Sequence, residues 1–222
     1  MSQIIKVTKI KNLQFQSFPR IKTLVILFGA FFLLNATPAD AHHAMGGMTP
    51  QNFWQGFLSG IAHPIIGIDH FAFIIAVGLL AALTKQGLFI PVGFILASLA
   101  GTVIHLFGLN LPAPELFISA SVLIFGAAIA LKNRPSLIWT VSLAAIAGVF
   151  HGYAYGESII GAEMTPLVAY MAGFAIIQLA IASLAFYITK SLVRSKTELP
   201  LRFAGLAILG TGIAFFSSAV LR

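Results

Sequence analysis

The chain has 222 residues, of which 59% are hydrophobic and only 9% are charged. Soluble domains carry about 25% charged residues, so this composition excludes an ordinary soluble protein and predicts an integral membrane protein. The formal net charge is +7, yet we expect no nucleic-acid partner, because the basic residues lie before the first apolar run and mostly in short loops between apolar runs. Cysteine is absent, which excludes disulfides, thiolate metal ligands and a cysteine nucleophile.

Residues 1–41 have the organisation of a cleavable signal peptide. Residues 1–23 are basic and polar, residues 24–36 are apolar, and an A-x-A sequence follows at residues 39–41. An apolar run of this length is short for a transmembrane helix, which needs roughly 20 residues. We therefore expect cleavage after Ala41, and the alternative is an uncleaved anchor helix.

Cleavage would leave His42 and His43 at the new amino terminus, with Met45 and Met48 close behind. A free amine beside an imidazole can bind one metal ion through two nitrogens. We interpret this segment as a flexible arm that captures metal. The alternative is a tail in which the histidine pair has no role.

Residues 42–222 are expected to form one domain. Their apolar runs are continuous, and the alternation that a membrane β-barrel requires is absent. The sequence therefore predicts an all-α integral membrane protein, a bundle of six transmembrane helices after a cleavable signal peptide. The six expected spans are near residues 55–83, 87–109, 115–131, 136–156, 165–189 and 203–221.

Basic residues are confined to one side of this arrangement. The expected loops 110–114 and 157–164 carry no Lys or Arg. Positive charge marks the cytoplasmic side, so we expect a bacterial inner-membrane protein whose mature amino terminus lies in the periplasm. The basic residues of the opposite loops are Lys85, Lys132, Arg134, Lys190, Arg194, Lys196 and Arg202.

Within residues 57–83 the only ionisable side chains are His63, Asp69 and His70. An aspartate at the centre of a bilayer costs about 2.5–3.5 kcal/mol on insertion scales, so such a group needs a partner or a function. Imidazole and carboxylate are ligands of divalent metals. The segment therefore predicts a metal site inside the membrane.

On a straight helix His63 and His70 would differ by about 20° in direction and roughly 10 Å in height, too far to share an ion. Pro64 removes a backbone donor, and Gly67 is a second weak point. We expect a kinked or unwound turn here that brings the two rings together. Asp69 would either bind the ion or orient a histidine.

A second polar group ends the fourth expected span, where His151 is followed six residues later by Glu157. His105 lies late in the second span, and all six histidines fall in or beyond the outer half of the expected bundle. This gathering predicts an ion path that opens outward. Any one of these histidines could instead be structural, and Glu157 could be a solvated charge.

The positions of several aromatic and amide side chains in the chain predict lesser roles for them. We expect Trp54, Tyr153 and Tyr155 to be anchors at the membrane interface. Tyr170 and Gln178 could line a path within the fifth span.

The two motifs, His-x5-Asp-His at residues 63–70 and Phe-His-Gly-x-Ala-x-x-Glu at residues 150–157, resemble those of the HupE/UreJ family of nickel/cobalt permeases. The resemblance covers essentially the whole mature chain. It implies uptake of Ni²⁺, sometimes Co²⁺, often in support of hydrogenase or urease maturation. The family's functional positions would be His63, Asp69, His70, His151 and Glu157.

These observations together predict a metal permease that moves the ion from periplasm to cytoplasm as a channel or carrier. The expected partners are the metal ion, membrane lipid and the maturation machinery of a nickel enzyme. We expect no enzymatic activity and no prosthetic group, and the absence of a Walker motif argues against ATP hydrolysis. Copper or another divalent metal, a metal sensor and a membrane metalloenzyme stay open as alternatives, as do proton coupling and oligomeric state.

Overall fold

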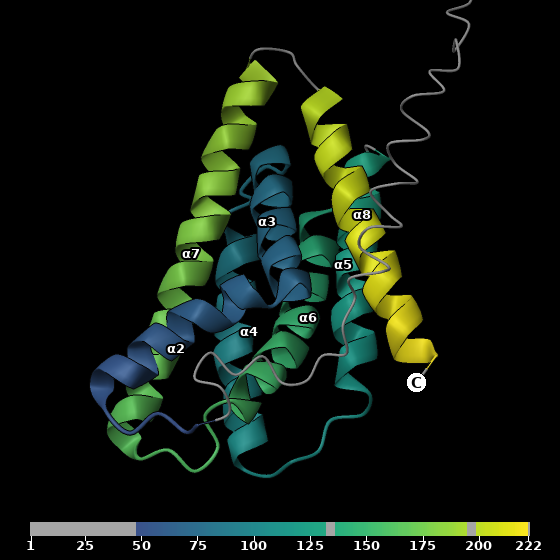
Figure 1. Ribbon diagram of the computed structural model, residues 1–222. Helices are drawn as coiled ribbons and strands as arrows, with labels where there is room; N and C mark the ends of the chain where they lie inside the picture. The colour runs from purple at the N-terminus through teal and green to yellow at the C-terminus, as the bar shows by residue number, and fades with distance from the viewer. Residues whose placement is uncertain (1–47, 132–135, 195–198, 222) are drawn as a thin grey trace, which may run out of the picture.

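The computed structural model describes residues 48–131, 136–194 and 199–221, and all regular secondary structure in these segments is α-helical (Figure 1). The predicted signal peptide, His42 and His43 lie outside the described residues. The seven helices are α2 (Phe53–Ile66), α3 (Ile68–Leu83), α4 (Phe89–Leu106), α5 (Pro114–Ala130), α6 (Leu137–Glu157), α7 (Met164–Arg194) and α8 (Leu199–Val220).

Helix length and composition support the predicted membrane class. Helices α4, α6, α7 and α8 are each long and apolar enough to cross a bilayer. Helices α2 and α3 form one broken span, bent by 81°, and α5 is an apolar helix of 17 residues. The chain is an all-α integral membrane protein; the predicted count of six spans stays a prediction, because α5 falls short of the usual spanning length.

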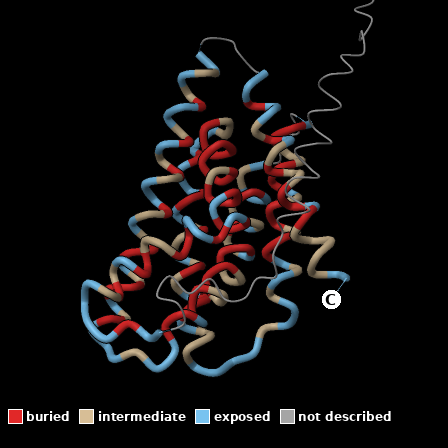
Figure 2. The backbone as a smooth tube through the Cα atoms, in the orientation of Figure 1, coloured by how far each residue is buried: buried red, intermediate tan, exposed pale blue. Residues whose placement is uncertain are grey.

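Helix α3 is the centre of the bundle. Twelve of its sixteen residues are buried, and it packs against α4, α5, α7 and α8. Figure 2 shows the buried positions concentrated along α3 and on the inner faces of its neighbours. A helix that is apolar all round must be enclosed, and α3 is enclosed by other helices rather than by lipid.

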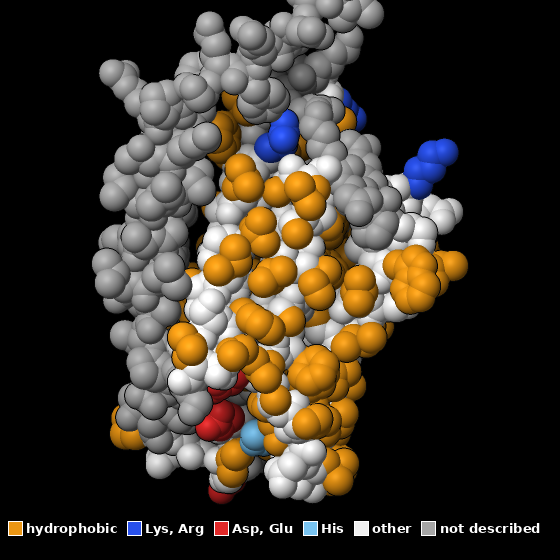
Figure 3. Space-filling model, turned by 90° about the vertical axis from the view of Figure 1, so that its right-hand side faces the viewer, with side chains coloured by type: hydrophobic (Ala, Val, Ile, Leu, Met, Phe, Trp, Pro, Cys, Tyr) orange, Lys and Arg blue, Asp and Glu red, His pale blue; other side chains and the backbone are white. Residues whose placement is uncertain are grey.

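The outer surface of the bundle is apolar between two charged ends. In the described part of the face in Figure 3 hydrophobic side chains predominate, with Lys and Arg at one end and acidic side chains at the other. Exposed residues such as Ile138, Trp139 and Tyr187 belong to this apolar surface. The distribution is that of a protein whose long faces meet acyl chains.

Glycine permits the close approach of α6 to α4. Gly148, Gly152 and Gly156 recur at intervals of four residues and so share one face of α6. A Cβ atom at Gly152 would overlap the backbone carbonyl of Ser98 on α4. Thr102 Oγ1 in turn donates a hydrogen bond of 2.7 Å to the Gly152 carbonyl. Small residues serve this purpose in many membrane helix pairs.

We expect Gly152→Ala to reduce the stability of the folded bundle, since the added methyl must push α4 away. Overpacking of this kind costs about 1–3 kcal/mol. Gly210→Ala on α8 is the matched control, because a Cβ there meets no atom within 4 Å. Unfolding of both purified variants in detergent would measure the difference, and equal stabilities would contradict this account of the α4–α6 contact.

Candidate functional site

The site is built around a break in the first span. Helix α2 ends and α3 begins on either side of Gly67, whose backbone is extended (φ −70°, ψ 101°). The Gly67 N–H donates to the His63 carbonyl at 3.1 Å. Pro64 lies inside α2, so the predicted kink is confirmed, but the helix breaks three residues after the proline.

The break brings the two motif histidines together. The ring centroids of His63 and His70 are 5.7 Å apart, whereas a straight helix would separate them by roughly 10 Å along its axis. Both side chains are buried. The 81° bend therefore turns two positions on one helix into neighbours from two helices.

His70 contacts the second motif. Its Nδ1 lies 2.7 Å from Nδ1 of His151 on α6. His151 is fully buried and stacks on Phe73, with ring centroids 4.6 Å apart. Its Nε2 lies 3.1 Å from Oγ of Ser121 on α5. The structure thus joins α3, α5 and α6 through one chain of polar atoms.

His63 has a separate set of partners at the start of α7 and the end of α6. Its Nδ1 lies 2.9 Å from the Tyr170 hydroxyl and 3.0 Å from the Ser158 hydroxyl. Tyr170 donates to the Tyr155 carbonyl at 2.8 Å. The Tyr155 ring also contacts both motif histidines, at 5.0 Å from His63 and 4.7 Å from His70.

Asp69 occupies the first turn of α3 beside His70. Its Oδ1 accepts a hydrogen bond of 2.8 Å from the His70 backbone N–H, and the residue is only 8% exposed. A carboxylate in the first turn of a helix interacts favourably with the helix dipole. Asp69 therefore stabilises the start of α3 and places a carboxyl group at the break.

His105 and Glu157 are placed apart from this buried network. His105 is partly buried and packs against Tyr153, with ring centroids 4.3 Å apart. Its Nδ1 is buried and makes no hydrogen bond within the described chain. Glu157 is exposed and close enough to His105 for their charges to interact. These two residues lie at the end of the bundle where α4 and α6 end.

Distances separate two kinds of histidine contact. Two imidazoles that share an ion through metal–nitrogen bonds of about 2.0–2.1 Å have bonded nitrogens about 3 Å or more apart and ring centres about 4.5–6.5 Å apart. The His63–His70 spacing of 5.7 Å fits such a shared ion. The His70–His151 nitrogen distance of 2.7 Å is too short and is a direct hydrogen bond.

No group of three or more His, Asp or Glu side chains in the described parts of the chain is arranged to hold a metal ion. The geometry instead offers a pair of imidazoles, with the remaining positions of an ion left to water or to hydroxyl and carbonyl oxygens. Such a partial set of ligands suits an ion that must bind and then leave.

Several members of the network were missed or misjudged from sequence. Tyr155 was expected to be an interfacial anchor, and this is wrong because its side chain is fully buried against the histidines. Ser121 and Ser158 carried no signal beyond being hydroxyl residues in apolar surroundings. Tyr170 and Gln178 are both fully buried, and Tyr170 contacts His63 directly.

Comparison with known proteins gives one family and one relative. Residues 30–215 match the family model described as HupE / UreJ protein. The chain is 27% identical over 183 residues to Protein HupE of Rhizobium leguminosarum bv. viciae, a match that covers 78% of this chain and 92% of that protein. No solved structure shows significant similarity to this chain. Because the family model spans most of the chain, including both histidine motifs, this protein belongs to the HupE/UreJ family.

Proposed function

We propose that this protein is a permease for nickel, with cobalt as a second substrate, and that it moves the ion from the periplasm to the cytoplasm. The observation that carries the proposal is the pairing of His63 and His70, two buried imidazoles brought to 5.7 Å by a helix break. Imidazole is a suitable ligand for Ni²⁺. Membership of the family supports the same assignment.

A broken helix is a suitable place for an ion site in a membrane. Interrupted spans expose backbone groups only where these line a cavity or are buried in protein. Transporters commonly bind their substrates at such interruptions. Here the interruption at Gly67 lies between His63 and His70 and next to Asp69, so backbone, imidazole and carboxylate groups meet at one level of the bundle.

Charge at the ends of the bundle supports the direction of transport. Glu115, Glu157 and Glu163 are exposed at the end nearer the histidines, and acidic side chains gather there in Figure 3. A negative surface concentrates cations near an entrance. The opposite end carries the described basic residues, Lys85, Lys190, Arg194 and Arg202, and positive charge favours the cytoplasmic side.

An aromatic cluster beyond the histidines favours a carrier over an open channel. Phe73 packs against Phe94 and Phe125, with ring centroids 5.1 and 4.7 Å apart. Phe73 also stacks on His151. These three buried rings fill the space next to His151, so an ion that passes between them to the cytoplasm would need them to move.

We expect His70→Ala to abolish uptake of radioactive nickel into proteoliposomes, because one of the two paired imidazoles is lost. Thr211→Ala on α8 is the control, since among the residues that the structure describes this buried hydroxyl bonds only to a carbonyl of its own helix. Membrane insertion of both variants should be normal. Near-normal nickel flux through the His70 variant would remove this residue from the path.

The wild-type protein in the same assay separates the proposed function from its alternatives. A saturable flux of nickel, reduced by competing cobalt, is the expected result. Binding of nickel without flux would instead indicate a sensor or a storage protein. If the protein neither bound nor transported any divalent metal, the proposal would be refuted.

We expect Gly67→Ala to raise the nickel concentration needed for half-maximal uptake. The added Cβ would lie 2.6 Å from Cδ2 of the His70 ring, so the ring must turn away. Gly93→Ala on α4 is the control, because a Cβ there meets only a Val141 methyl group at 3.4 Å. An identical concentration dependence in wild-type protein and Gly67→Ala would show that the ring position at the break is unimportant.

A further inference from the structure

The hydrogen bonds around His151 determine which of its ring nitrogens carries a proton. Ser121 Oγ lies 2.6 Å from the Ile118 carbonyl, and because a carbonyl can only accept, the serine proton is directed there. The same Oγ therefore accepts from Nε2–H of His151, 3.1 Å away. A neutral imidazole has one N–H, so Nδ1 of His151 is an acceptor.

The protonation of His151 in turn determines which ring nitrogen of His70 carries a proton. Its Nδ1 lies 2.7 Å from the accepting Nδ1 of His151, so His70 must donate from Nδ1. The Nε2 of a neutral His70 then carries a lone pair. A lone pair on Nε2 is what a metal ion requires of an imidazole ligand.

His63 reaches the same state through different partners. The Tyr170 hydroxyl gives its proton to the Tyr155 carbonyl at 2.8 Å. Its oxygen therefore accepts from Nδ1–H of His63 at 2.9 Å, and the Ser158 hydroxyl lies 3.0 Å from the same nitrogen. The proton is thus on Nδ1, and Nε2 of His63 also carries a lone pair.

We propose that Ser121 and His151 are positioning residues that hold His70 in the tautomer whose Nε2 binds the transported ion, and that Ser158 and Tyr170 act in the same way on His63. The proposal rests on the proposed transport of a divalent metal. The three histidines then have two different roles: His63 and His70 bind the ion, while His151 acts through His70. A histidine ligand of a metal generally has its second ring nitrogen fixed by such a partner.

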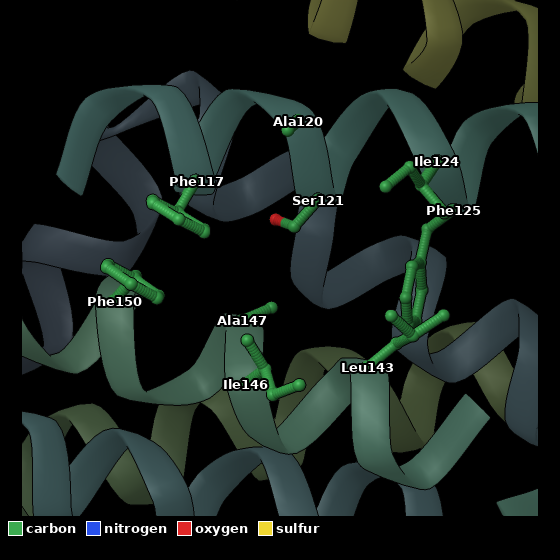
Figure 4. Close-up of a pocket in the computed structure, with 9 residues that line it drawn as sticks. All are labelled: Phe117, Ala120, Ser121, Ile124, Phe125, Leu143, Ile146, Ala147 and Phe150. Atoms are coloured by element: carbon green, nitrogen blue, oxygen red, sulfur yellow. The ribbon is translucent and has the colours of Figure 1, made fainter. Parts of the chain in front are cut away.

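The surroundings of Ser121 make its role testable. A cavity of about 260 Å³ lies between α5 and α6, and Figure 4 shows the Ser121 side chain at its wall with its oxygen as the only polar side-chain atom drawn. The cavity opens onto the apolar outer surface between exposed side chains such as Phe117 and Ile146, so it faces acyl chains, which supply no hydrogen-bond partner. Removal of the Ser121 hydroxyl therefore leaves no water in the cavity to replace it as the acceptor for His151.

The chain offers a conservative variant and a matched control. Threonine at position 121 keeps the hydroxyl, and the cavity has room for its extra methyl group. Ser119 is a buried serine on the same helix, and within the described part of the chain its hydroxyl bonds only to the Glu115 and Leu116 carbonyls. Ser119→Ala removes an equivalent hydroxyl without touching a histidine.

The experiment is ¹⁵N NMR of the full chain with labelled histidine in lipid nanodiscs, without metal and at about pH 8, where an ordinary imidazole is neutral. His70→Gln identifies the His70 resonances. In wild type, Ser121→Thr and Ser119→Ala we expect His70 to be protonated at Nδ1 and not at Nε2. In Ser121→Ala we expect a substantial shift of His70 to the Nε2-protonated form.

Nickel uptake by the same variants supplies the second measurement. Loss of a ligand's own hydrogen-bond partner typically costs about 10- to 100-fold in metal affinity. Because Ser121 acts on His70 through His151, we expect the KM of Ser121→Ala to rise by about 10-fold, the lower end of that range. Ser121→Thr should restore the wild-type KM, and Ser119→Ala should leave it unchanged. A purely structural role for Ser121 would lower the amount of inserted protein without moving the tautomer.

The outcomes distinguish this inference from the proposed function. A wild-type His70 that is protonated at Nε2, or at both nitrogens, overturns the inference whether or not nickel is transported. An Ser121→Ala variant with an unchanged tautomer and KM also overturns it. If the tautomers are as expected but the wild-type protein neither binds nor transports any divalent metal, the proposed function fails while the positioning network stands.

Discussion

Hydrocarbon supplies no hydrogen-bond partner, so each polar group inside this bundle depends on another group of the protein. The arrangement around the break at Gly67 follows from that constraint. His63, His70 and His151 are buried, and each hydrogen-bonds to a hydroxyl group or to another imidazole. The resulting network includes residues of five helices, α2, α3, α5, α6 and α7.

Close backbone packing supports the network. Gly152 allows α6 to approach α4, and Gly60 allows α2 to approach α7, where a Cβ would overlap the Tyr170 carbonyl. These contacts fix the depth of His151 and of Tyr170, which are the partners that orient His70 and His63. Small residues therefore contribute to the site without touching an ion, because they set the distances between the helices that carry its side chains.

The elements of the fold were largely predictable, because long apolar runs leave few alternatives to helices. The kink near residues 64–67 was also predictable, since proline and glycine fell between two polar residues in an apolar run. The burial of Tyr155 was not, because a tyrosine near the end of a span fits an interface as well as a core. Ser121 could not be recognised either: its role depends on α5 lying beside α6, and no local pattern encodes that contact.

The break at Gly67 also has a mechanical consequence. His63 belongs to α2, which packs closely on α7 through Gly56 and Gly60, whereas His70 belongs to the central helix α3. Only one non-helical residue connects the two parts. A pivot of α2 with α7 about that residue would therefore change the separation of the two imidazoles directly. The affinity for the ion and the conformation of the bundle would then be directly coupled.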